Sequence, residues 1–103
     1  MTQSVDQQLR FAIAHKRLIE LAYKGSARLV EPHDYGVQNG KAQLLVYQRG
    51  AMRSAPGKSV IGWRLFEVLL IERCVVMDET FKGSRGTSDQ EHYEWDVLYA
   101  RVN

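Results

Sequence analysis

A two-residue turn signal near the middle of the chain constrains the fold most strongly. Asn39 and Gly40 stand between two stretches, 27–37 and 42–48, that we interpret as strands. A type I′ turn needs positive φ at both central positions, and Asn followed by Gly adopts this conformation readily. The sequence therefore predicts a β-hairpin, with the register of both strands set by the turn.

Further strand patterns surround this hairpin. Apolar and polar residues alternate over 19–24, and the stretches 63–68 (WRLFEV) and 71–77 (IERCVVM) are rich in β-forming residues. Pro32 lacks an N–H donor, so we expect a sheet edge or a bulge near Glu31–His33. Five short strands favour an antiparallel sheet that curls into a small barrel.

Two capping boxes predict a helix at each end of the chain. Ser4 and Gln7 precede apolar residues at helical spacing, which predicts a helix over 5–16. The C-terminal apolar residues fit both a helix (Trp95, Leu98, Tyr99, Val102) and a strand (Tyr93, Trp95, Val97, Tyr99). We favour a short helix, because Ser88 and Glu91 form a second capping box.

Length and cysteine content indicate one domain and a reducing compartment. A chain of 103 residues normally builds a single core. We expect a single domain over 1–103, with its core at about 5–82 and an acidic extension over 83–103. Cys74 has no cysteine partner, and the sequence has neither a signal-peptide pattern nor an apolar run of about 18 residues. These features predict a cytoplasmic protein without a membrane span.

The charges are unevenly distributed, although the formal net charge is only +2. Residues 1–64 carry ten Lys or Arg against four Asp or Glu, whereas residues 65–103 carry four against eight. The stretch 49–64 contains four basic residues and no acidic one (Arg49, Arg53, Lys58, Arg64). Such a stretch is either a solvated face or a surface for an anion.

No catalytic or metal-binding set emerges from the sequence. The histidines and Cys74 lack the short paired spacings of zinc sites, and no nucleophile can be matched with a base. We therefore expect a non-enzymatic protein without a metal or another cofactor.

Aromatic and basic residues do come together in the sequence. Tyr47 and Arg49 close one predicted strand, and Trp63 and Arg64 open the next. Aromatic rings can stack on bases, and guanidinium groups can bind phosphate through two hydrogen bonds. We predict that Tyr47, Arg49, Trp63 and Arg64 bind a ligand; alternatively, the rings pack in the core and the arginines face solvent.

Over about 10–82 the chain resembles the WYL domain, a bacterial module found in transcriptional regulators. The resemblance lies in short segments in the same order and spacing: AIAHKR, IELAY, Val30-Glu31-Pro32, LLVYQ and Arg64-Leu65-Phe66, with Ile71 beyond. It implies a five-stranded SH3-like or Sm-like barrel in an α+β, mainly β fold. It also implies ligand sensing, with a nucleotide or single-stranded nucleic acid as the ligand.

The sequence departs from the family pattern at two places. Ala42-Gln43-Leu44 replaces the Trp-Tyr-Leu that names the family, and residues 66–71 lack both arginines of its FRxDRI motif. Arg64 is retained. The leading hypothesis is an anion-binding regulatory module. The alternative is a module that binds a protein partner or a second copy, through the barrel edge near Pro32 or the C-terminal apolar residues.

Overall fold

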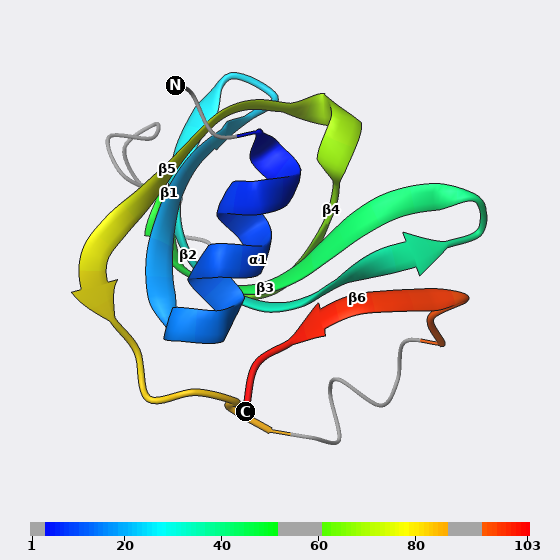
Figure 1. Ribbon diagram of the computed structural model, residues 1–103. Helices are drawn as coiled ribbons and strands as arrows, with labels where there is room; N and C mark the ends of the chain where they lie inside the picture. The colour runs from blue at the N-terminus through cyan, green and yellow to red at the C-terminus, as the bar shows by residue number, and fades with distance from the viewer. Residues whose placement is uncertain (1–3, 52–60, 87–93) are drawn as a thin grey trace.

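The computed structural model describes residues 4–51, 61–86 and 94–103, and this part of the chain is mainly β (Figure 1). An N-terminal helix precedes an antiparallel sheet of six strands. The elements are α1 (Val5–His15), β1 (Arg17–Tyr23), β2 (Ser26–Gln38), β3 (Lys41–Ala51), β4 (Gly62–Glu67), the 3₁₀ turn η1 (Val68–Leu70), β5 (Ile71–Thr80) and β6 (Val97–Arg101).

The predicted N-terminal capping box is confirmed. The Gln7 backbone N–H donates to Oγ of Ser4 at 3.1 Å, and the Ser4 N–H donates to Oε1 of Gln7 at 3.0 Å. The helix ends before Lys16, which is left-handed with φ 54°. Its buried face, formed by Leu9, Ala12 and Ile13, packs on the sheet.

The predicted hairpin is also confirmed. Asn39 and Gly40 have φ values of 55° and 77°, and Gln38 pairs with Lys41 across the turn. The β1–β2 turn repeats this arrangement, because Lys24 and Gly25 have φ values of 50° and 79°. Each turn thus joins antiparallel neighbours through two residues with positive φ.

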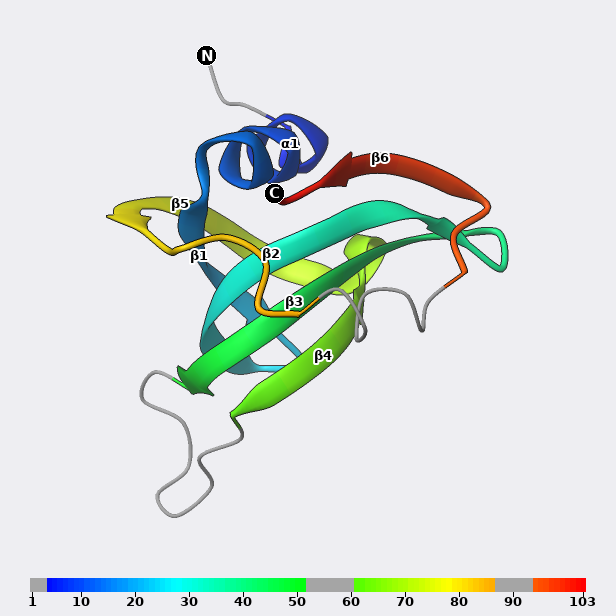
Figure 2. The ribbon, with the colours of Figure 1, turned by 90° about the horizontal axis from the view of Figure 1, so that it is seen from below.

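The strands follow the order β4-β3-β2-β1-β5, and β6 pairs with β2. The sheet curls, and α1 lies across one of its open ends (Figures 1 and 2). The buried core fills the space between the helix and the inner face of the sheet; it includes Leu18, Ile19, Val30, Leu44, Val46 and Phe66.

The predicted C-terminal helix is wrong for the described residues, because 97–101 form β6. Ser88 and Glu91 lie outside the described residues. β1 pairs with β2 only from Ser26 to Val30. Beyond Val30, the backbone N–H and C=O groups on the same edge of β2 need other hydrogen-bond partners. β6 supplies them by pairing with residues 34–37. This long-range pairing selects the strand from two patterns that the local sequence allows.

After β5, the chain runs back over β2 and β3 as an extended segment, Phe81–Arg85, which we call the strap (Figure 2). The Phe81 N–H donates to the carbonyl of Lys16 at 2.9 Å, and the Ser84 N–H to that of Asn103 at 3.0 Å. Among the described residues, no helix is long and apolar enough to cross a membrane.

Candidate functional site

A bulge in β2 shapes the surface beneath the strap. Two successive residues of β3 pair with Pro32 and Asp34, so His33 is an extra residue in β2. This bulge agrees with the expectation for Pro32. Side chains of a regular strand point to its two faces in turn, and the extra residue shifts this alternation by one. Glu31 and Asp34 therefore project from the same face, although they are three residues apart.

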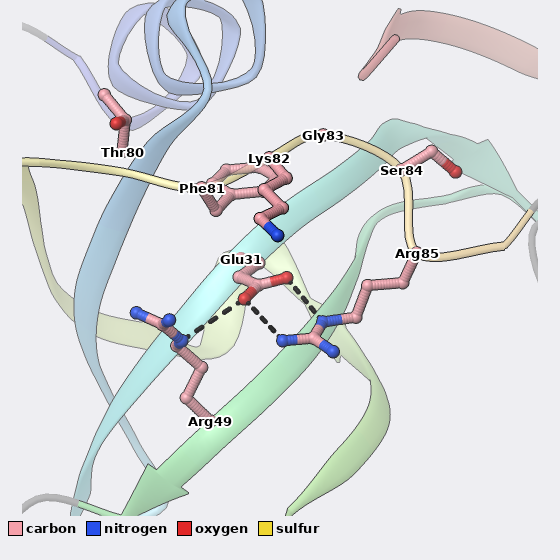
Figure 3. A pocket seen from close by; sticks show the side chains of 8 residues that line it. All are labelled: Glu31, Arg49, Thr80, Phe81, Lys82, Gly83, Ser84 and Arg85. Carbon is pink, nitrogen blue, oxygen red and sulfur yellow. Dashed lines mark hydrogen bonds and ion pairs between the residues drawn. The ribbon is translucent and has the colours of Figure 1, made fainter.

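Glu31 is a buried carboxylate held by two arginines. Its side chain is 3% exposed. Arg85 of the strap donates from Nε to Oε1 at 2.7 Å and from Nη2 to Oε2 at 2.9 Å, and Nε of Arg49 lies 3.3 Å from Oε2 (Figure 3). Burying a carboxylate costs free energy unless cations and hydrogen bonds compensate, so both arginines are tied to this position.

Asp34 forms a second buried ion pair beside the first. Arg101 of β6 donates to it from Nε at 3.0 Å and from Nη2 at 2.9 Å, and Nε1 of Trp95 donates at 3.2 Å. The two carboxylates therefore fix two different segments on β2: Glu31 fixes the strap and Asp34 fixes the C-terminal strand.

His33, the bulged residue, is fully buried and has partners at both ring nitrogens. Nδ1 lies 2.8 Å from the carbonyl oxygen of Glu31, and the Arg85 backbone N–H donates to Nε2 at 3.2 Å. Trp63 meets the imidazole edge-on at 4.7 Å between ring centroids, and Phe81 stacks at 5.7 Å. Burial lowers the pKa of His33, so the ring stays neutral near pH 7.

A pocket of about 670 Å³ opens between the strap, the middle of β2 and the end of β3. Ligand pockets typically span about 300–1,000 Å³. Three cationic side chains and one carboxylate are among the described lining residues, which are Glu31, Arg49, Thr80, Phe81, Lys82, Gly83, Ser84 and Arg85 (Figure 3).

The four residues predicted to bind a ligand fall in three different places. Arg49 lines the pocket. Tyr47 and Trp63 pair across β3 and β4 with centroids 5.6 Å apart, and the Arg85 guanidinium covers the Tyr47 ring at 3.9 Å. Arg64 pairs with the core residue Val46, so it lies on the opposite face of the sheet, where Nη1 donates to the Trp63 carbonyl at 2.8 Å. The structure thus gathers three of the four on one face.

The sequence interpretation missed Glu31, Lys82 and Arg85 as site residues. Arg85 lies within the segment interpreted as an acidic extension, 54 residues away from Glu31. An available signal was the pair of carboxylates flanking Pro32-His33, where a bulge brings both to one face. Arg53 and Lys58 of the predicted basic stretch lie outside the described residues.

Within the described part of the chain, no group of three or more His, Cys, Asp or Glu is placed to hold a metal ion. Cys74 is partly buried, and burial raises its pKa to about 11. Comparison of the chain with protein-family models, with curated proteins and with solved structures found no match.

Proposed function

We propose that this chain is a cytoplasmic, non-enzymatic module that binds a phosphate-bearing ligand in the pocket under the strap. The observation that carries the proposal is the lining charge: Arg49, Lys82 and Arg85 against Glu31, or three positive charges against one negative. The net positive charge of this concave site favours anions.

Glu31 prepares the site for an anion, although it shares the ligand's charge. It fixes two long side chains in advance, which lowers the entropy lost on binding. Arg49 approaches Glu31 with Nε, while its other two nitrogens point away from that carboxylate (Figure 3). These nitrogens suit two parallel hydrogen bonds to phosphate oxygens.

Tyr47 and Trp63 are already in contact with other side chains, so they are poorly placed to stack on a base. The guanidinium of Arg85 already covers Tyr47, and Trp63 packs edge-on against both Tyr47 and His33. The proposed ligand is therefore recognised by its phosphate, which either a free nucleotide or a single-stranded nucleic acid supplies.

Calorimetric titration with inorganic phosphate, a nucleoside monophosphate and a single-stranded oligonucleotide tests this proposal. Arg49→Gln and Lys82→Gln should each weaken phosphate binding by roughly tenfold, as expected for losing a charged hydrogen bond. Arg73→Gln removes an exposed charge on β5, outside the pocket lining, and should leave the affinity unchanged.

The salt dependence separates the two sources of phosphate. Binding of a single strand should weaken with a log–log slope of about −0.7 per phosphate contact. If the mononucleotide binds as tightly as the oligonucleotide, the ligand is a free nucleotide. If none of the three probes binds at low salt, the proposal is wrong.

We also propose that the curled sheet is an SH3-like or Sm-like barrel and that the chain is a WYL-type regulatory module. One feature supports closure: the Glu67 N–H at the end of β4 donates to the Tyr23 hydroxyl on β1 at 3.2 Å, although β4 and β1 are not neighbours in the sheet order. Nuclear Overhauser contacts between the backbones of β4 and β5 would test closure, and their absence would indicate an open sheet.

A second candidate function is self-association through β6. Val97, Leu98 and Tyr99 are 49%, 41% and 39% exposed. Antiparallel pairing of two β6 strands would bring these apolar side chains of the two copies together.

Sedimentation of Leu98→Lys tests this second candidate. A dimeric wild type that becomes monomeric in this variant supports it, and a monomeric wild type excludes it. Leu69→Lys, at an exposed position on η1, is the matched control and should not change the assembly state.

A further inference from the structure

We propose that protonation of His33 releases the strap from β2, so that the pocket between them comes apart in acid. His33 belongs to the bulge, whereas Phe81 and Arg85 belong to the strap, so contacts at a single imidazole join the two segments. The consequence for a ligand rests on the proposed function, but the release of the strap does not.

The hydrogen bonds around the ring fix its tautomer. Nε2 accepts the Arg85 N–H, so the ring proton must be on Nδ1, which donates to the Glu31 carbonyl. A second proton would bind the Nε2 lone pair and turn that atom into a donor. Two N–H groups would then face each other, and the Arg85 amide would lose its acceptor.

Charged groups of both signs face the imidazole. On β2, the Glu31 and Asp34 carboxylates favour the protonated ring, and the Arg85 guanidinium of the strap opposes it. The packed rings of Trp63 on β4 and Phe81 on the strap carry no charge. Arg49 and Arg101, from β3 and β6, are paired with the two carboxylates and reduce their effect on the ring.

The pH range in which the strap is released follows from the burial of His33. Burial has the largest effect on the pKa of this histidine and lowers it. An unfolded histidine titrates near about 6.5, so the released state binds more protons than the closed one below that pH. The contribution of the neutral ring to strap closure is therefore complete above about pH 6.5 and decreases as the pH falls through the lower folded-state pKa.

Nuclear magnetic resonance on the ¹⁵N-labelled full chain tests the switch without a ligand. We expect the His33 ring and the Arg85 amide to titrate with one shared midpoint below the ordinary histidine pKa. The hydrogen-exchange protection of the Arg85 amide, corrected for intrinsic exchange, should fall at least about tenfold between about pH 7.5 and 5.

Two variants isolate the imidazole. His33→Gln offers a side-chain carbonyl to the Arg85 N–H and does not titrate, so the Arg85 protection should no longer change with pH. His15→Gln, at the exposed end of α1, should behave like wild type. If Arg85 is unaffected when His33 titrates, or if the pH effect persists in His33→Gln, the inference is wrong.

The inference and the proposed function can fail separately. If His33→Gln does not fold, the shared midpoint in the wild type decides the question. If the strap opens in acid but no phosphate binds at any pH, the switch stands and the proposed function fails. If phosphate binds equally well in wild type and His33→Gln at both pH values, the pocket does not depend on the switch.

Discussion

Arg85 binds Glu31 through two parallel hydrogen bonds of 2.7 and 2.9 Å across 54 residues of sequence. We expect Arg85→Gln to destabilise the fold by about 2 kcal/mol, because charged hydrogen bonds contribute about 1.5–3 kcal/mol. Arg49→Gln should cost less, since its approach to Glu31 is a single contact of 3.3 Å. Urea denaturation measures both; equal costs would contradict this ranking.

Gly36 allows β6 to approach β2 closely. A Cβ on Gly36 would collide with the Val97 carbonyl oxygen, so Gly36→Ala should detach β6 and cost several kcal/mol. Gly40→Ala is the matched comparison, because it meets open space and should cost only about 1–2 kcal/mol for its positive φ. Denaturation midpoints for the two variants measure the difference.

Tyr35 should resist ionisation. Burial, together with the 2.7 Å hydrogen bond that its hydroxyl donates to Asp6, raises its pKa to about 12. An unfolded tyrosine ionises near about 10, so stability should fall as the pH rises from about 10 towards 12. The pH dependence of unfolding should flatten over this range in Tyr35→Phe; an identical curve in both proteins would contradict the assignment.

Cys74 should react slowly with alkylating agents. Burial raises its pKa from 9.0 to about 11, so its thiolate population near pH 8 is roughly a hundredfold below that of an exposed thiol. Alkylation by iodoacetamide should speed up to the rate of a free cysteine in denaturant. Equal rates in the native and denatured protein would show that the thiol is not buried.

Local signals in the sequence predict several elements correctly. The Ser4–Gln7 capping box and the Asn39-Gly40 turn each depend on a few adjacent residues, and Pro32 predicts irregularity through its missing donor. β6 differs, because 97–101 fit two periodicities and the choice depends on unpaired backbone groups in β2.

The site was harder to predict because it, too, depends on contacts between residues that are far apart in the sequence. Adjacent strand residues point to opposite faces, so Trp63 and Arg64 cannot share a site on one face, and the register of β4 against β3 shows that Trp63 is the one on the face of Tyr47. Arg85 reaches Glu31 only because the strap crosses β2, and no local pattern encodes that crossing. The composition of the site was therefore partly predictable, whereas its geometry required the fold.

The most direct test of phosphate binding in this pocket is to map amide chemical shifts while titrating the ¹⁵N-labelled protein with a nucleoside monophosphate. We predict saturable shifts concentrated at Arg49 and the strap, which need roughly tenfold more ligand in Arg49→Gln and are unchanged in Arg73→Gln. No shifts at low salt, or shifts centred on α1 or η1, would contradict the account.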